Sequence, residues 1–422
     1  MFGLFKSTPD VLVAGAGPVG LYAALNLAQR GIRVAIIDSE WRGTTHSYAL
    51  ALHPRSLELL DEVGVAQAVL DKAWKLRRVG FYDGPERRAS LDMGQLATPF
   101  PFVAVLPQSE FENLLGKALI EAGVKVHYNH RLARIESEAD SVWVEVHELG
   151  KESMGYGVAH VETIVERSER VRLPLIIAAD GHDSLARKQS HIKFESVRPA
   201  DHFAVFEFAA SGKLPSEICV GLNPKSSEVL WPMRHDRCRA SFSLDEDVAD
   251  WESRDKDRLL VDVGNYRLPQ LELGTMHRLI AERAPWFRGK VERVDWRMAV
   301  RFEYRLASAF GAGRVWLVGD AAHMAGPVGI HSMNVGLREA HDLCDVYARL
   351  LAKSGSERSL DRYNSERLAE WHALLGLGPS QKPAKTADPW VAEHADRLLQ
   401  CVPASGAHLR ALLGQIGLAP PG

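Results

Sequence analysis

Cysteine is scarce in this sequence, and no segment has the character of a leader or a membrane span. The four cysteines, Cys219, Cys238, Cys344 and Cys401, lack the close pairs that structural zinc sites and disulfide frameworks use, so we expect buried thiols and no metal. The segment that precedes the first strand, residues 1 to 10, is short and polar. No apolar run approaches the roughly 20 residues of a membrane helix. These absences predict a cytoplasmic protein.

Charge of one sign is not in excess either. The chain carries 51 basic and 54 acidic residues, a formal net charge of -3, so no global field attracts nucleic acid or an anionic membrane. With 46% hydrophobic and 25% charged residues, the composition is that of an ordinary globular protein. A length of 422 residues predicts two or three cooperating lobes, without internal repeats.

The first informative motif in the sequence is a glycine-rich turn. Apolar runs at 11–14 and 34–37 flank a helical pattern at 21–30, as in a βαβ unit of a parallel sheet. Between the first run and the helix stands Gly15-Ala16-Gly17-Pro18-Val19-Gly20, whose glycines allow a tight turn, close approach of a pyrophosphate and close packing of helix on strand. Asp38 ends the second run, where an acid accepts hydrogen bonds from a ribose. This arrangement predicts an adenine dinucleotide site.

Two later motifs also follow apolar strands. Asp180-Gly181 comes after the run at 173–179, and Gly319-Asp320 comes after the run at 315–318. Pro327, Gly329, Met333 and Asn334 follow the second motif, near the expected start of a helix at about Ser332. The free N–H groups of such a helix would suit the negative charge of a reduced flavin, so the motifs favour FAD over NAD.

Between these motifs the pattern becomes that of an antiparallel sheet. Runs at 203–208, 218–222, 229–233 and 239–244 read as strand, turn and strand, and we interpret them as a substrate lobe. Trp231 in this lobe could stack on a planar ligand, although packing in the core explains it equally well. The predicted domains are FAD-binding (1–78, 104–187 and 301–350), substrate-binding (79–103 and 188–300) and C-terminal helical (351–422).

At this point the sequence resembles the PHBH-fold family, the class A flavoprotein aromatic hydroxylases, to about residue 370. The resemblance rests on the glycine fingerprint, the DG motif at Asp180-Gly181 and the GD motif at Gly319-Asp320, with support from 57–60, Gln108 in LPQSEFENLL and LDRYNSERL. It implies an α/β fold: a Rossmann-like doubly wound FAD-binding sheet, an inserted antiparallel β-sheet substrate domain and C-terminal helices.

The resemblance also implies individual roles. Asp320 would contact the ribityl or pyrophosphate region of FAD, Gln108 would lie near the flavin linker, and the backbone of Leu132 would touch the adenine. Asn334 would border the isoalloxazine, and Asp180 would support the site from behind. The full set of expected cofactor-binding residues is Gly15, Gly17, Pro18, Gly20, Asp38, Gln108, Leu132, Asp180, Gly319, Asp320, Pro327, Gly329, Met333 and Asn334.

Three positions depart from the family pattern. Tyr48 replaces a common arginine, Gly326-Pro327 replaces a double proline, and Gly329-Ile330-His331-Ser332 replaces Gly-Gly-Gln-Gly. We therefore hypothesise that reduction by NADPH or NADH is altered, or replaced by reduced flavin from a partner reductase. Pro327 and His331 are the candidate catalytic residues, although a lone histidine is more often structural.

The predicted activity is that of an FAD-dependent monooxygenase, which hydroxylates or epoxidises a small aromatic or polycyclic substrate through a flavin C4a-hydroperoxide. Three alternatives stay open: a halogenase of the same fold, whose W-x-W-x-I-P segment is missing here, a flavin reductase or dehydrogenase, and a non-catalytic FAD-binding redox sensor. Besides the substrate and O2, the expected partners are a flavin reductase and, at most, a second copy of the chain.

Overall fold

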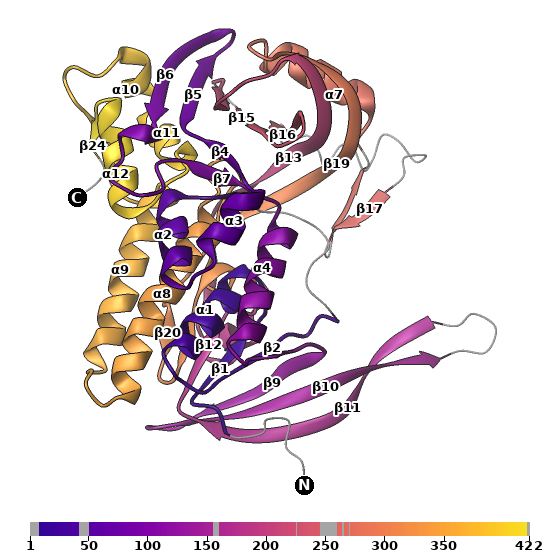
Figure 1. Ribbon diagram of the computed structural model, residues 1–422, viewed down its shortest axis with the longest axis vertical. Helices are drawn as coiled ribbons and strands as arrows, with labels where there is room; N and C mark the ends of the chain where they lie inside the picture. The colour runs from indigo at the N-terminus through magenta and orange to yellow at the C-terminus, as the bar shows by residue number, and fades with distance from the viewer. Residues whose placement is uncertain are drawn as a thin grey trace.

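The computed structural model describes residues 8–41, 50–154, 160–224, 226–244, 260–263, 266–269 and 271–419. It consists of a lower lobe built on a mainly parallel sheet, an upper lobe built on a larger sheet that is antiparallel except for one strand pair, and helices that run along one side of both (Figure 1). Within those ranges no helix is both long and apolar enough to cross a membrane.

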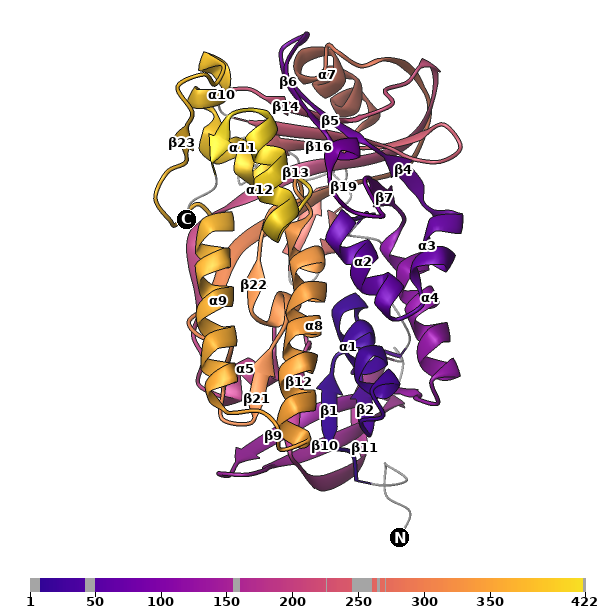
Figure 2. The ribbon, with the colours of Figure 1, turned by 60° about the vertical axis from the view of Figure 1, so that its left-hand side comes forward.

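The lower lobe contains a six-stranded sheet with β1 (Val11–Ala14) near its middle. The strand order is β20 (Gly311–Ala312), β21 (Val315–Leu317), β12 (Leu175–Ala178), β1, β2 (Val34–Ile37) and β8 (Val126–His127), and every pairing except β20 with β21 is parallel. All residues of β1 and β12 are buried, which explains their unbroken apolar sequences. Helix α1 (Pro18–Gln29) lies between α4 (Gln108–Glu121) and α8 (His331–Leu351), as Figure 2 shows.

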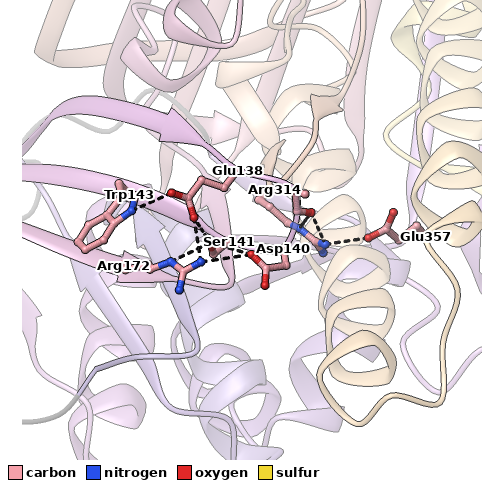
Figure 3. A network of polar contacts seen from close by, with 8 residues as sticks. Glu138, Asp140, Ser141, Trp143, Arg172, Arg314 and Glu357 are labelled. Atoms are coloured by element: carbon pink, nitrogen blue, oxygen red, sulfur yellow. Dashed lines mark hydrogen bonds and ion pairs between the residues drawn. The ribbon is translucent and has the colours of Figure 1, made fainter.

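A three-stranded sheet extends from the lower lobe. Its strands are β9 (His130–Ser137), β10 (Val142–Met154) and β11 (His160–Leu173), and the β10–β11 hairpin projects beyond the body of the molecule (Figure 1). Arg314 fixes the β9–β10 turn by donating to the carbonyl of Ala139 at 3.1 and 2.7 Å, and it also pairs with Glu357 at 2.8 Å (Figure 3). The turn is thereby tied to the start of α9 (Arg358–Leu374).

The upper lobe is an eight-stranded sheet that carries α7 (Leu273–Arg283). Its order is β22 (His323–Met324), β19 (Arg288–Ala307), β13 (Phe194–Lys213), β16 (Arg237–Leu244), β15 (Ser227–Pro232), β14 (Ile218–Leu222), β5 (Arg78–Asp83) and β6 (Glu86–Asp92). One face packs on α7 through Phe206, Phe208 and Leu279, whereas the other face joins the core of the lower lobe. The two long strands β13 and β19 connect the lobes.

Shorter elements complete the fold. Those between the lobes are β3 (Ala51–Leu52), α2 (Pro54–Glu62), α3 (Ala66–Lys72), β4 (Trp74–Leu76), a 3-10 turn (Met93–Gln95) and β7 (Val103–Val105). Later come α5 (Leu185–Gln189), β17 (Leu260–Val263), β18 (Tyr266–Pro269), the 3-10 turn η3 (Gly319–Ala321), β23 (Lys382–Pro383), α10 (Pro389–Glu393), α11 (Ala395–Cys401), α12 (Gly406–Gln415) and β24 (Leu418–Ala419). Helices α10 to α12 gather at the upper end of α8 and α9, beside the large sheet (Figure 2).

The predicted fold class is confirmed: a parallel α/β lobe, an inserted antiparallel sheet and C-terminal helices. The predicted C-terminal helical region (351–422) contains α9 to α12 and, in addition, the short strands β23 and β24. The exact domain boundaries stay a prediction, although β19 runs unbroken through residue 301, where one boundary was expected. All four cysteines are buried and free, as expected.

Candidate functional site

Four of the predicted residues follow neighbouring strands of the parallel sheet. Gly15 follows β1, Asp38 follows β2, Asp180 comes two residues after β12, and Asp320 lies in η3 beyond β21. Because these strands are parallel, their carboxyl ends meet along one edge, where ligands collect in such sheets. The folding of the chain therefore brings the three motifs together.

The glycine turn at this edge has two crowded positions and one open position. A Cβ on Gly15 would lie 2.1 Å from the carbonyl oxygen of Ala179, and one on Gly20 would lie 2.0 Å from that of Gly15. At Gly17, by contrast, no described atom lies within 4 Å of an added Cβ. The first and third glycines thus allow packing, and the second leaves free space in front of the N-terminus of α1.

The carboxylate of Asp38 braces this turn. Its Oδ2 accepts a hydrogen bond from the backbone N–H of Ala16 at 2.5 Å, and its Oδ1 accepts one from Glu40 at 2.8 Å. The side chain is only partly buried, and each oxygen keeps a second lone pair for a ribose hydroxyl. The carbonyl of Asp38 accepts from the N–H of His130, which brings β9 and the buried Leu132 to the same corner.

Gln108 begins α4 on the other side of this corner. Its Nε2 donates to Glu112 Oε1 at 2.8 Å. Burial raises the pKa of the Tyr128 phenol, and the negative charges of Asp38 and Glu112 add to that rise, which places both carboxylates close to one ring. The residues expected at the adenosine and linker end therefore cluster in space.

The DG motif supports the GD motif through Arg187. Oδ2 of Asp180 accepts from the N–H of Ala186 at 3.1 Å, while its buried Oδ1 has no partner among the described residues. Burial raises the pKa of this carboxyl. The buried guanidinium of Arg187 donates to the carbonyls of Ala321 at 2.7 Å and His182 at 2.8 Å, so it ties η3 to the DG turn.

A fully buried carboxylate lies beneath the GD motif. Glu339 on α8 accepts from the backbone N–H of Gly319 at 2.9 Å, from Nε2 of His323 at 2.8 Å and from Nε1 of Trp371 at 2.6 Å. Burial opposes its ionisation, but His323 and these hydrogen bonds outweigh burial and hold the pKa of the carboxyl below its usual range. The His323 ring stacks on Trp371 with centroids 3.7 Å apart. The network fixes the backbone that presents Asp320.

Asp320 itself points outward. Its side chain is exposed to solvent, yet the protein around it raises its pKa, mainly by desolvation. Asp320 is thus free to accept hydrogen bonds from a ligand at the carboxyl edge of the sheet.

Asn334 braces the protein rather than presenting its amide to a ligand. Its Oδ1 accepts from the N–H of His53 and from Ser56 Oγ, both at 2.7 Å. Its Nδ2 donates to the carbonyls of Ala51 at 2.9 Å and Ile330 at 2.8 Å. All four hydrogen-bonding positions of the amide are engaged within the protein, so the side chain holds the loop before α8, and the predicted place of Asn334 beside the isoalloxazine stays a prediction.

That loop contains the chain's departures from the family pattern. Ile330 has φ 50° and ψ 47°, a left-handed conformation that is strained for a β-branched residue. The buried His331 ring donates from Nε2 to the carbonyl of Val402 at 2.9 Å, toward the C-terminal segment. This geometry gives no support to the predicted catalytic role of His331. Pro327 and Met333 are partly exposed, and Tyr48 lies outside the described residues.

Trp231 lies on the face of the large sheet that joins the lower lobe. It belongs to the same buried cluster as Val205, Val220 and Val229, and it is only 2% exposed. Its predicted contact with a substrate stays a prediction.

These features fit an adenine dinucleotide. The open space at Gly17, the unpartnered buried Oδ1 of Asp180 and the accessible Asp320 share one edge of the sheet. The first turns of α1 and α8 carry no side-chain cap among the described residues, so their N–H groups are available to phosphate or to a flavin anion. No cluster of metal-ligating side chains occurs within the described ranges.

Comparison with known proteins identifies the family. The family model described as "FAD binding domain" matches residues 8–376. The chain therefore belongs to this family of FAD-binding proteins, and the predicted family and cofactor are confirmed.

Several similar proteins are named as monooxygenases. The chain is 27% identical over 374 residues to 6-methylpretetramide 4-monooxygenase of Streptomyces rimosus, covering 87% of this chain and 60% of that protein. It is 27% identical over 416 residues to 12-dehydrotetracycline 5-monooxygenase/anhydrotetracycline 6-monooxygenase of the same species, covering 98% and 77%. A solved p-nitrophenol 4-monooxygenase from Pseudomonas putida matches with a TM-score of 0.67 at 20% identity, covering 96% and 91%. The predicted enzyme class agrees with these names.

Several residues of the site were not predicted from the sequence. Glu339 lies on a buried face of α8 with Val335 and Leu343, and an isolated charge on such a face is a signal that it has a partner. His53, which donates from Nε2 to the carbonyl of Gly329 at 2.9 Å, had no such signal, because its partner lies 276 residues away in the sequence.

Proposed function

We propose that this protein inserts one atom of O2 into a planar aromatic or polycyclic substrate by using bound FAD. The observation that carries the proposal is the common edge at which Gly17, Asp38 and Asp320 meet, with the apolar face of the large sheet next to it in the core. Two of the named relatives act on tetracycline-type compounds, which favours a fused-ring substrate here as well.

The protein's own residues would bind FAD and the substrate and would exclude water from the site. Reduced flavin supplies the activation of O2 when it is bound. Asp38 and Asp320 would bind the sugar and ribityl hydroxyls, and the N-termini of α1 and α8 would stabilise negative charge on pyrophosphate and flavin. The apolar inner face with Val205, Val229 and Trp231 would hold a planar ligand away from water.

A single-turnover experiment tests the proposal without any assumption about the electron donor. Holoenzyme with chemically reduced FAD is mixed with anhydrotetracycline under anaerobic conditions and is then exposed to O2. We expect hydroxylated product in about one equivalent per flavin, and none from Asp320→Ala protein, which should lose FAD. Reoxidation of the flavin without oxygenated product, for this and other planar polycyclic compounds, would contradict the proposal.

The alternatives give different products in the same experiment. A halogenase would require a halide and incorporate it, a dehydrogenase would oxidise its substrate without O2, and a redox sensor would give no product at all. The relatives' names favour the monooxygenase over all three.

We also propose that direct reduction by NADPH or NADH is slow. The left-handed Ile330 supports this, because its Cβ stands in the loop before α8 where the family resemblance expects bare glycine backbone. Stopped-flow mixing of the holoenzyme with either nucleotide should give reduction that is slow and insensitive to substrate. Rapid, substrate-stimulated reduction would refute the proposal and remove the need for a partner reductase.

A cytoplasmic location and a monomeric or homodimeric state also remain proposals. They are tested by cell fractionation and by analytical ultracentrifugation of the purified holoenzyme.

A further inference from the structure

The loop formed by residues 325–330 passes very close to the side chain of Tyr304. A Cβ added to Gly326 would lie 2.4 Å from the Tyr304 hydroxyl oxygen and 3.2 Å from Cζ. Gly326 has no positive φ, so nothing in its backbone conformation demands glycine. The glycine is required because the phenol occupies the space of a side chain.

The Tyr304 phenol is held by Asp201 and Arg198. Its hydroxyl donates to Asp201 Oδ2 at 2.6 Å, and the guanidinium of Arg198 lies 3.5 Å from the ring centroid. Arg198 also pairs with Asp201 at 2.9 Å. Burial raises the pKa of the phenol well above its usual value, so the hydroxyl stays a neutral donor. Tyr304 is therefore a rigid surface against which the loop rests.

The C-terminal segment lies against the other end of the same loop. The carbonyl oxygen of Gln400 would be 2.4 Å from a Cβ on Gly329, and Gln400 Oε1 accepts from Arg198 at 2.9 Å. Two residues farther on, the carbonyl of Val402 accepts from His331. The loop is thus enclosed between β19 and the end of α11, and Arg198 links the two sides.

We propose that Tyr304 is a positioning residue that sets the location of loop 325–330 at the flavin edge, and that Gly326 is its obligatory partner. The inference rests on the proposed placement of the flavin beside this loop. The phenol touches neither cofactor nor substrate in this account; it acts through the backbone of residues 325–330, which Arg198 and Gln400 couple to the C-terminal segment.

A compensating pair of substitutions tests the proposal. Gly326→Ala should weaken FAD binding about tenfold and shift the visible absorption of the bound flavin, because the loop must move away from the phenol. Tyr304→Phe removes the hydroxyl oxygen and leaves ring carbons 3.2 and 3.3 Å from the new Cβ. The double variant should therefore recover FAD affinity and spectrum to the values of Tyr304→Phe alone. Gly414→Ala on α12, where no described atom lies within 4 Å of an added Cβ, is the matched control and should bind FAD normally.

Two results would overturn the proposal. One is Gly326→Ala protein that binds FAD with wild-type affinity and spectrum. The other is a loss of FAD affinity in Gly326→Ala protein that the added Tyr304→Phe substitution fails to reverse. If Gly326→Ala protein does not fold, a double variant that also does not fold would overturn the proposal in the same way. Because affinity and absorption are measured without O2 or substrate, the outcome does not depend on the proposed monooxygenase reaction.

Discussion

The glycines of the first turn act in opposite ways although they belong to one motif. Gly15 has φ +100°, and its neighbour Ala179 leaves no room for a Cβ, whereas Gly17 has φ -70° and open space in front of it. Protein packing therefore accounts for Gly15, and only a ligand that approaches the backbone accounts for Gly17.

This contrast predicts that two alanine substitutions separate stability from binding. Gly15→Ala should destabilise the FAD-free protein by about 2 kcal/mol or more through strain and collision. Gly17→Ala should change its stability by no more than about 1 kcal/mol but weaken FAD binding about tenfold or more. Thermal unfolding and fluorescence titration with FAD measure the two effects. Equal losses of stability in both variants would contradict the assignment of Gly17 to the cofactor.

The buried His331 should make the protein sensitive to acid. Burial lowers the pKa of its imidazole to about 4, well below the value of about 6.5 in an unfolded chain. Both states are neutral above pH 6.5, and the unfolded state takes up its proton first as the pH falls. Stability should therefore decrease by about 3 kcal/mol between pH 6.5 and about pH 4.

The comparison variant is His331→Gln, which can still donate to Val402 but does not titrate. Urea unfolding from pH 7 to pH 4 should show a steeper loss for the wild type than for this variant. Histidines away from His331 contribute equally to both proteins, whereas His53, whose ring centroid lies 5.8 Å from that of His331, loses the charge of this neighbour in the variant. If the stability of the wild type and of the variant fell equally with pH, His331 would not be a neutral, buried imidazole in the folded protein.

At the scale of elements, α8 is the centre of the site. Its first turn faces the cofactor edge. In that turn Asn334 accepts a hydrogen bond from the loop at His53, and farther along the helix Glu339 accepts one from the GD motif. Glu339 also joins α9 through Trp371. The helix therefore fixes the loop at His53 and the GD motif and ties both to α9.

Glu339→Gln tests this role with a change of one atom. The amide cannot accept from all of Gly319, His323 and Trp371, so at least one buried donor loses its partner, which costs about 1–3 kcal/mol. We expect lower thermal stability and FAD binding weakened about tenfold, since the backbone that presents Asp320 is freed.

Arg314→Ala is the matched control for that prediction. It also removes several polar contacts, but these lie at the β9–β10 turn and the start of α9, away from the carboxyl edge of the parallel sheet (Figure 3). It should lower stability and leave FAD affinity unchanged. If both variants lost affinity alike, the effect of Glu339 would be general destabilisation.

Elements with simple periodicity were predictable from the sequence. The strands β1, β2 and β14 have the predicted bounds, and α8 begins at His331, one residue from the expected start. The strand β19 was not predicted, although Val294, Trp296 and Met298 alternate with the charged residues Asp295 and Arg297 along it. Twenty-residue strands with several bulges exceed the usual length, so a search for short runs misses them.

At the scale of the whole molecule, the motifs revealed which residues share the cofactor edge, but not what holds them there. Arg187 reaches η3 across 134 residues, and Asn334 reaches Ser56 across 278. Such contacts depend on tertiary packing and leave no periodicity in the sequence. The orientation of the His331 ring could not be predicted for the same reason, because its hydrogen-bond acceptor, the carbonyl of Val402, lies in the distant C-terminal segment.

The central claim is that oxygen from O2 enters a planar substrate at this site. The most direct measurement is a single turnover of chemically reduced holoenzyme with anhydrotetracycline under 18O2 in ordinary water, followed by mass spectrometry of the product. The account predicts that the product carries one 18O atom. An oxygenated product without the label, or a substrate that is oxidised without gaining oxygen, would contradict it.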